Sequence, residues 1–233
     1  MKNPATALIE LRKRIGAAEQ KYGRLPGSVK LLAVTKTKLI KDIYPAIDCG
    51  QTDFAENYVQ EAVGKITAIN DSRLTWHFIG PIQSNKTRAI AEYFHWVHSL
   101  DRAKIALRLN DLRPDHLPPL NICIQINICN EQSKSGILPD ALRELVKVCT
   151  ALPRLRLRGL MALPVPSENF DQQRVPFRRL RELFDELHSS QPGLDTLSMG
   201  TSHDMEAAIA EGSTMVRIGT VLFGPRDHLL NRC

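Results

Sequence analysis

The sequence lacks several features that would each point to a particular class of protein. No apolar stretch approaches the roughly 20 residues of a membrane-spanning helix, and the N-terminus has no hydrophobic region typical of a signal peptide. The five cysteines among 233 residues are odd in number and include no Cys-x-x-Cys pair. Cys123 and Cys149 fall in an expected strand and an expected helix, so we do not expect a disulfide framework. The sequence therefore predicts a soluble protein of the reducing cytoplasm, without membrane association.

A dense basic run is also missing, although the formal net charge is +6. The richest basic stretch, 174–181, places its arginines between Phe177, Leu180 and Phe184 at helical spacing. That spacing is typical of the solvated face of an amphipathic helix. We therefore expect no nucleic-acid partner, whereas a modest positive balance suits an anionic, phosphate-bearing ligand.

What the sequence does contain is a strand–helix unit that recurs along the chain. Short apolar runs, typical of buried parallel strands, alternate with segments whose apolar residues recur at helical spacing. We expect strands at 31–34, 52–54, 76–80, 96–100, 120–128, 155–163, 196–199 and 215–218. We expect helices at 4–22, 41–48, 85–93, 101–112, 139–152, 177–188 and 203–210, and one more that carries Val59, Val63 and Ile66 on one face.

Connections that are mostly shorter than about eight residues favour an α/β fold of the (β/α)8 TIM-barrel type. A doubly wound sheet is the main rival. We see no linker, so we expect one domain over 1–233. Asn3 and Ser202 are expected to cap the helices at 4–22 and 203–210.

Unusual polar side chains cluster just after the expected strands rather than before them, which is the end of a barrel that carries chemistry. Lys36 follows the first strand. There, a partly desolvated ammonium can lose its proton and act as an amine nucleophile. Taken alone, Lys36 and its neighbour Lys38 are explained as well by solubilising charges in a loop.

The loops after the seventh and eighth strands have the composition of a phosphate site. Gly200-Thr201-Ser202 opens an expected helix, and Gly219-Thr220 is a turn of small residues. Backbone N–H groups in such loops can approach an anion. Ordinary capping by Ser202 and an ordinary turn at Gly219 are the alternatives, but the pair together favours phosphate. Asp204 would repel that phosphate unless its side chain points aside.

Arg217 discriminates between two ligands that a lysine amine and a phosphate site suggest, a sugar phosphate in an aldolase and pyridoxal phosphate (PLP). The eighth strand of a barrel neighbours the first, so Arg217 can stand beside Lys36. A guanidinium has only donors and does not deprotonate, so it would keep a facing pyridine nitrogen unprotonated. An aldolase has no evident need for this, and we therefore expect PLP as the cofactor.

Stretches spread over the whole chain resemble the pyridoxal phosphate homeostasis proteins, and the motif at 76–86 is highly specific. These stretches are LAVTKT at 32–37, FAENYVQE at 54–61, WHFIGPIQSNK at 76–86, SKSG at 133–136, RGLMA at 158–162, LSMGTSHDMEAAI at 197–209 and VRIGT at 216–220. The resemblance implies a single-domain barrel similar to the N-terminal domain of alanine racemase, a fold type III PLP protein.

The resemblance also implies roles for individual residues. Lys36 would hold PLP as a Schiff base, and Arg217 would face the ring nitrogen, while Ser202 and the Gly219-Thr220 turn would hold the phosphate. Thr201 stands where many members have methionine, which still leaves a backbone contact at that position. The full set of residues expected to bind the cofactor is Lys36, Asn57, His77, Met161, Ser198, Thr201, Ser202, Arg217, Gly219 and Thr220.

Some of these residues have a second interpretation. His77 either points into the barrel mouth or packs beneath it, and Met161 is either a wall of the cofactor pocket or core. Asn57, at a strand end, is a candidate for a supporting polar contact. Lys134 is either an entrance guard or, as we favour, a solvated loop lysine.

We expect neither a catalytic residue nor a metal site. His95 and His98 are three residues apart and would face opposite sides of a strand, which does not suit a shared metal ion. The implied function is intracellular PLP homeostasis with little or no catalysis, and a racemase-like enzyme that acts on amino acids is the alternative. The chain leaves no room for the second domain of alanine racemase, and a ring nitrogen that faces Arg217 is a poor electron sink.

After Thr220 only residues 221–233 remain, enough for one short helix. We therefore expect the outer face of the cofactor to be open to solvent, which suits uptake and release. The partners that we consider besides PLP are apo-enzymes that require PLP. We expect a monomer or a weak homodimer.

Overall fold

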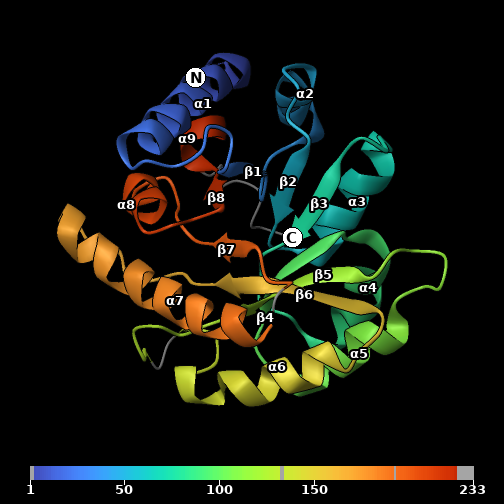
Figure 1. The fold of residues 1–233 in the computed structure, drawn as a ribbon. Coiled ribbons are helices and arrows are strands. Elements are labelled where there is room, and N and C mark those ends of the chain that lie inside the picture. The colour runs from blue at the N-terminus through green and yellow to red at the C-terminus, as the bar shows by residue number, and fades with distance from the viewer. Residues whose placement is uncertain (1–2, 132–133, 192, 225–233) are drawn as a thin grey trace.

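The computed structural model of the chain describes residues 3–131, 134–191 and 193–224. Within them, eight parallel strands close into a barrel in chain order, and helices surround it (Figure 1). The strands are β1 (Lys30–Val34), β2 (Asp53–Glu56), β3 (Thr75–Phe78), β4 (Trp96–Leu100), β5 (Leu120–Gln125), β6 (Leu155–Met161), β7 (Thr196–Ser198) and β8 (Met215–Ile218). The α-helices are α1 (Pro4–Lys21), α2 (Ile40–Asp48), α3 (Val59–Ile69), α4 (Thr87–Tyr93), α5 (Ala103–Leu112), α6 (Leu142–Thr150), α7 (Phe170–Ser190), α8 (Met205–Ala210) and α9 (Thr220–Phe223). The expected TIM barrel is confirmed, and the doubly wound sheet is excluded.

Pairing between β1 and β8 closes the barrel. Leu32 of β1 lies opposite Arg217 of β8, and Ala33 lies opposite Ile218. On its other side β1 pairs with β2, where Ala33 lies opposite Phe54. Because all three strands are parallel, their carboxyl ends meet at one end of the barrel, with Lys36 just beyond β1.

Alternate strand residues build two separate cores. Side chains such as Phe54, Phe78 and Ile122 point outward and pack against the helices. Leu32, Val34, Ala55, Trp96, Cys123, Met161 and Met215 form a smaller apolar cluster inside the barrel. Burying one large apolar side chain stabilises a fold by about 1.5–3 kcal/mol. The large outer core therefore supplies most of the stability, and the interior is left able to hold polar side chains.

Polar side chains outside the apolar pattern decide where several helices begin. Asn3 caps α1 as expected, and its side chain accepts a backbone N–H. The helix expected at 177–188 begins earlier, at Phe170, because Asn169 caps that start by accepting the Gln172 N–H at 3.0 Å. Pro176 lies inside α7 and removes one backbone donor without ending the helix.

The helix expected at 203–210 begins later, at Met205, and Ser202 does not cap it. Asp204 precedes the helix, and its Oδ1 accepts the backbone N–H and the hydroxyl of Thr201 at 2.6 and 2.8 Å. The carboxylate thus stabilises a turn ahead of the helix. Ser202 remains part of the loop after β7.

Four strands end earlier than the apolar pattern indicates. β3 ends at Phe78 rather than at 80, and β7 ends at Ser198 rather than at 199. β5 ends at Gln125 rather than at 128, and β6 ends at Met161 rather than at 163. Beyond β5, Ile126 makes only an isolated bridge with Ile137. Past β5 the apolar residues Ile126 and Ile128 are buried although they lie outside the strand, whereas Leu163 beyond β6 is exposed.

Candidate cofactor-binding site

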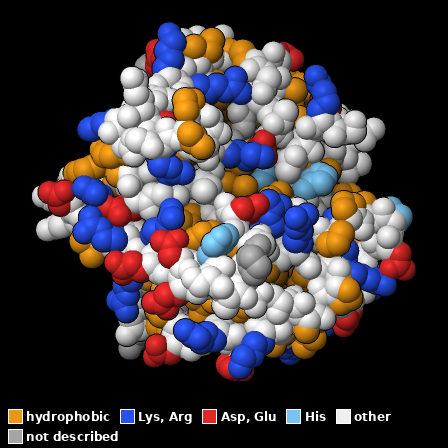
Figure 2. All heavy atoms as spheres, in the orientation of Figure 1, with side chains coloured by type: hydrophobic (Ala, Val, Ile, Leu, Met, Phe, Trp, Pro, Cys, Tyr) orange, Lys and Arg blue, Asp and Glu red, His pale blue; other side chains and the backbone are white. Residues whose placement is uncertain are grey.

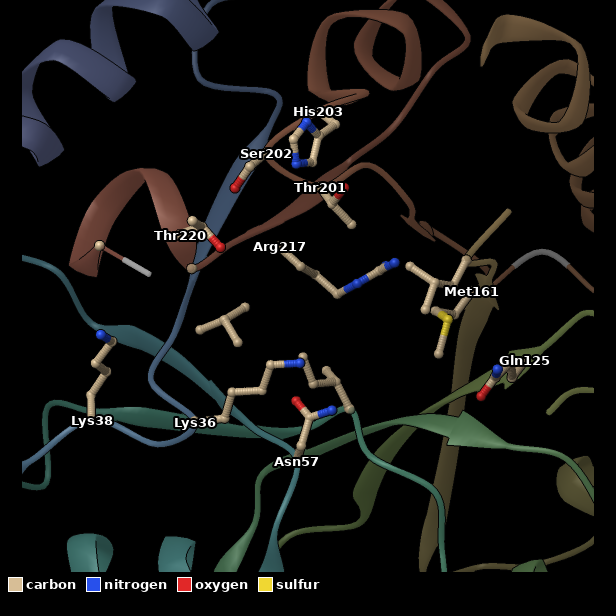
Figure 3. A pocket seen from close by; sticks show the side chains of 15 residues that line it. Lys36, Lys38, Asn57, Gln125, Met161, Thr201, Ser202, His203, Arg217 and Thr220 are labelled. Carbon is tan, nitrogen blue, oxygen red and sulfur yellow. The ribbon is translucent and has the colours of Figure 1, made fainter. Parts of the chain in front are cut away.

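A cavity of about 340 Å³ lies at the carboxyl ends of the strands, within the range of roughly 300–1,000 Å³ that is typical of small-molecule sites. Figure 3 shows Lys36 and Arg217 extending into the same space from different strands. Eight of the ten residues expected to bind the cofactor line this cavity: Lys36, Asn57, Met161, Thr201, Ser202, Arg217, Gly219 and Thr220. The loops after β1, β2, β7 and β8 thus meet as the sequence predicted.

A turn of unusual backbone conformation directs Lys36. The next residue, Thr37, has a φ of 62°, a left-handed conformation that a β-branched residue rarely adopts. Glu61 on α3 holds this turn, since its Oε1 accepts the Thr37 N–H at 2.6 Å. In Figure 3 the Lys36 side chain reaches toward Asn57 and Arg217, whereas Lys38 points away from them. The turn therefore sends two nearby lysines in different directions.

A buried ion network lies beside this turn. The Lys65 ammonium donates to Glu56 Oε1 at 2.7 Å, to Glu61 Oε1 at 2.6 Å and to the carbonyl of Thr35 at 2.6 Å. The Thr35 hydroxyl also donates to Glu56 at 2.6 Å. Burial raises the pKa of the Glu56 carboxyl, and the charge of Lys65 opposes that rise. Breaking a buried ion pair costs about 3–5 kcal/mol, so this network anchors the end of β1.

Arg217 reaches into the cavity from β8. Its Nη1 donates to the carbonyl and the hydroxyl of Ser198 at 2.6 and 2.9 Å, and its Nη2 donates to the carbonyl of Ala162 at 3.0 Å. Burial lowers the pKa of the guanidinium to about 10, which leaves it protonated at neutral pH. Three of the five N–H donors of the Arg217 guanidinium thus bind acceptors in the described residues, and the other two remain for a ligand.

The loops after β7 and β8 line the same cavity and carry backbone N–H groups that are not used within the described part of the fold. Among the described residues, no acceptor takes up the N–H of Ser202, Gly219 or Thr220. Gly200 allows the first loop to pass close to α8, because it has a φ of 97° and a Cβ there would lie 2.6 Å from the Ala208 side chain. Unused amides in tight turns are the donors of many anion sites.

Thr201 does not offer the backbone contact that the resemblance implies. Its N–H is already donated to Asp204, and so is its hydroxyl. The same two bonds turn the Asp204 carboxylate toward Thr201, which is how an acidic residue is accommodated beside this loop. Thr201 lines the cavity and shapes the turn, while its neighbours carry the unused amides.

Asn57 brings a buried acceptor to the cavity. Its Oδ1 has no hydrogen-bond partner among the described residues. Gly80 passes close behind it, and a Cβ at that position would lie 2.1 Å from the Asn57 carbonyl oxygen. Only glycine permits this approach, which explains the glycine in the motif at 76–86. A buried acceptor without a partner, next to unused donors, is expected where a polar ligand binds.

His77 and Ser198 do not line the cavity. Both are fully buried inside the barrel. His77 therefore packs beneath the mouth, which was one of its two interpretations, and Ser198 contacts Arg217. Met161 lines the cavity and also belongs to the inner core, so both of its interpretations hold.

The cavity is also lined by Lys38, Gln125 and His203, which the sequence did not indicate as site residues. Gln125 was hidden inside a strand predicted to run on to 128, and His203 inside a helix predicted to start there. Had the end of β5 and the start of α8 been predicted correctly, Gln125 would have stood at the end of a strand and His203 in the loop after one. Polar residues at such positions indicate a site. Lys134 donates to the carbonyl of Leu163 at 3.2 Å and pairs with Glu131, so it is a bonded loop residue.

No group of His, Cys, Asp or Glu side chains in the described part of the chain could hold a metal ion. His98 lies inside the barrel, whereas the exposed His95 accepts the backbone N–H of Trp76 at 3.0 Å. The two histidines therefore face different sides, as their spacing predicts.

Comparison with known proteins gives relatives over nearly the whole chain. Residues 8–227 match the family described as alanine racemase, N-terminal domain. The chain is 54% identical over 228 residues to the pyridoxal phosphate homeostasis protein of Pseudomonas aeruginosa, with 98% of each chain covered. It is 53% identical over 231 residues to the protein of that name from Escherichia coli strain K12, with 98% of this chain and 99% of the relative covered.

Among solved structures, the chain is similar to PipY of Synechococcus elongatus PCC7942 with PLP bound. The TM-score is 0.82 at 35% identity, and the match covers 95% of this chain and 100% of PipY.

The closed barrel and the lysine at the end of its first strand define a barrel of the alanine racemase N-terminal-domain class. Within that class, the chain belongs to the family of pyridoxal phosphate homeostasis proteins, as the resemblance predicted.

Proposed function

We propose that this protein binds PLP, holds it on Lys36, and serves PLP homeostasis with little or no catalysis of its own. The observation that carries the proposal is the single cavity that brings together the Lys36 amine, the Arg217 guanidinium and the amides of two loops. The relatives named above are called homeostasis proteins, and PipY was solved with PLP bound.

The donor set of the cavity fits this cofactor. Bound PLP supplies an aldehyde, a pyridine nitrogen and a phosphate. The Lys36 amine can condense with an aldehyde, with loss of one water molecule. Arg217 offers only donors to a ring nitrogen and so disfavours its protonation. The amides of Ser202, Gly219 and Thr220 can hold the phosphate, and Lys and Arg side chains gather around the middle of the face in Figure 2, which favours an anion.

Labelling tests the attachment site. Purified protein with PLP should be yellow, and borohydride reduction should fix the cofactor to the peptide that contains Lys36. Lys36→Ala should lose the label and keep its fold, because the residue lies beyond β1 rather than in a core. Lys147→Ala, an exposed lysine on α6, should keep the label. A label fixed on Lys38 or Lys86, or no label at all, would contradict the assignment.

A PLP carrier and a PLP-dependent enzyme differ in what the site must contain. A catalyst of this barrel type needs a second proton-handling group across the ring from the lysine, and protein above the ring to exclude water. An unprotonated ring nitrogen beside Arg217 is also a poor electron sink. We therefore expect holo-protein to reactivate an apo-enzyme that requires PLP, without turnover of a panel of amino acids. Robust turnover that is lost in Lys36→Ala would favour the racemase-like alternative.

The remaining parts of the proposal concern setting and assembly. We propose a cytoplasmic protein, which is supported by the free state of Cys49, Cys123, Cys129 and Cys149. No helix in the described residues has the length and apolarity to cross a membrane. We propose one domain over 1–233 and a monomer or weak homodimer. The expected open outer face depends partly on 225–233, which lie outside the described residues.

A further inference from the structure

A chain of side-chain hydrogen bonds crosses the barrel interior from the amino-terminal end of β2 to the cavity. Asp53 Oδ1 lies 3.1 Å from His77 Nε2, and His77 Nδ1 lies 2.9 Å from His98 Nε2. His98 Nδ1 lies 2.8 Å from the hydroxyl of Ser198, which accepts from Arg217 Nη1 at 2.9 Å. We call this series, from Asp53 through His77, His98 and Ser198 to Arg217, the barrel relay.

The barrel relay is shielded from water along its length. His77, His98 and Ser198 are fully buried, and Asp53 and Arg217 are 7% and 6% exposed. Trp96 stacks against both imidazoles, with ring centroids 5.6 and 5.7 Å away. The two rings are therefore held in place by packing as well as by hydrogen bonds.

The residues at the two ends of the relay determine in which direction its hydrogen bonds are donated. A guanidinium only donates and a carboxylate only accepts, while a neutral imidazole has one donor and one acceptor. Burial lowers the pKa of both histidines, so both are neutral at neutral pH. Burial by itself would raise the pKa of Asp53, but its hydrogen bonds to His77 and Lys30 and its ion pair with Lys30 at 3.0 Å lower it to about 2.

With Asp53 ionised, His77 donates from Nε2 and must accept at Nδ1. His98 then donates from Nε2 and accepts at Nδ1, so the Ser198 hydroxyl donates to His98 and keeps a lone pair for Arg217. Every bond in the series is satisfied in this one direction. Hydrogen bonds aligned in series polarise one another, which strengthens them in a buried environment.

Arg217 needs such support because it is a buried charge without an adjacent counter-charge. Its hydrogen-bond partners among the described residues are two carbonyls and one hydroxyl. No carboxylate in that part of the chain forms an ion pair with it, although the charge of Asp204 acts on it from a greater distance. A buried, unpaired charge is costly. Asp53, at the far end of the relay, is the carboxylate that the series of hydrogen bonds connects to Arg217.

We propose that Asp53, His77, His98 and Ser198 are positioning residues that orient Arg217, so that its unused N–H donors face the ring nitrogen of bound PLP. This inference rests on the proposed function, in which Arg217 faces the cofactor. It also gives His77 and Ser198, which were expected to touch the cofactor, an indirect role. Asp53 and His98 join them as residues that act on the site from beneath.

The first test uses wild-type protein without cofactor and needs no variant. Histidine labelled with ¹⁵N in the ring should show His77 and His98 as neutral rings that carry the proton on Nε2. A proton on Nδ1 of either ring would overturn the directed relay. Because PLP is absent from this measurement, its result stands even if the protein proves not to bind PLP.

The second test changes the far end of the relay in PLP-loaded protein. Asp53→Asn should shift the absorption maximum of bound PLP and weaken PLP affinity about three- to tenfold, the effect of one hydrogen bond. Asp71→Asn is the matched control, because Asp71 also has a pKa of about 2, set by Arg73, and lies outside the relay. It should change neither quantity.

A wild-type spectrum and affinity in Asp53→Asn would overturn the proposal. Should that variant fail to fold, Ser198→Ala takes its place, because Ser198 lies at the Arg217 end of the relay. The same changes in the absorption maximum and the affinity for PLP are then expected. Failure of wild-type protein to bind any PLP would reject the proposed function. The tautomers of His77 and His98 would still show in that case whether the directed relay exists.

Discussion

Thr37, next to Lys36, has a strained backbone conformation. Its left-handed φ costs a residue other than glycine about 1–2 kcal/mol. Its hydroxyl is also buried without a partner among the described residues. Such strain persists only where the surroundings impose it. Here Glu61 and the Lys65 network supply that constraint, and the result is the direction in which Lys36 points.

We predict that Thr37→Gly stabilises the fold and weakens PLP binding. Relief of the strain should outweigh the extra freedom of glycine in the unfolded chain and add about 1 kcal/mol, or about 2–4 °C in Tm. The freed turn should let Lys36 swing, so that affinity for PLP falls severalfold. Thermal unfolding and a PLP titration measure the two effects.

Asn70→Gly is the control for this prediction. Asn70 also has a left-handed conformation, at the end of α3 and away from the cavity lining. The control should stabilise the fold without changing the affinity. A less stable Thr37→Gly variant would show that the turn carries no strain.

At the scale of elements, the two loops that precede α8 and α9 line the side of the cavity where we propose that the phosphate binds. α8 and α9 contain six and four residues, too few for a strong helix dipole. We therefore expect the attraction for a phosphate to come from individual N–H groups, in loops shaped by the Asp204 turn and the close approach at Gly200. This differs from the helix start that the sequence indicated at 203.

We predict that the phosphate contributes most of the affinity through these loops. Ser202→Ala removes one hydroxyl, and because a charge-assisted hydrogen bond contributes about 1.5–3 kcal/mol, PLP should bind roughly ten- to a hundredfold more weakly. Pyridoxal, which has no phosphate, should bind far more weakly than PLP and respond little to the substitution. Ser189→Ala, on the exposed side of α7, serves as the control. Equal affinities of wild-type protein for PLP and pyridoxal would show that the phosphate site lies elsewhere.

On the scale of the whole molecule, the barrel interior holds the buried barrel relay beside the small apolar cluster, and the larger apolar core surrounds both. The outer core stabilises the fold, which allows the interior to keep neutral histidines where apolar side chains would pack better. This arrangement makes folding stability depend on pH.

We predict that folding stability falls as pH drops below about 6.5. His77 and His98 have pKa values lowered by burial, so below pH 6.5 the unfolded chain binds more protons than the folded protein does. Stability therefore rises with pH in that window, by up to about 1.4 kcal/mol per pH unit for each histidine. Glu56 and Asp101, with pKa values raised by burial, contribute a slope of opposite sign at more acidic pH.

Urea unfolding at several pH values isolates the histidine contribution. The slope of stability against pH should be smaller in His98→Asn than in the wild type, and unchanged in His116→Asn, which alters an exposed histidine. An identical slope in His98→Asn would mean that His98 titrates alike in the folded and unfolded states.

The sequence by itself determined the barrel and the location of its site. Apolar runs and helical periodicity are local properties, and eight repeats of one unit leave few ways to bury so many strands. Because parallel strands bring their carboxyl ends together, the sequence alone predicts that Lys36, Asn57 and Arg217 share one cavity. The expectation of one domain over 1–233 stays a prediction.

Only the tertiary structure decided what each polar side chain does. Ser198 lies a hundred residues from His98 in sequence, yet the two share a hydrogen bond. No local pattern reports such a contact, since it depends on the register of strands on opposite parts of the barrel. For the same reason the Asp204 turn, the engaged amide of Thr201 and the burial of His77 emerged only from the folded chain. Hydrophobic periodicity is written along the sequence, whereas hydrogen-bond partners are set by distances in space.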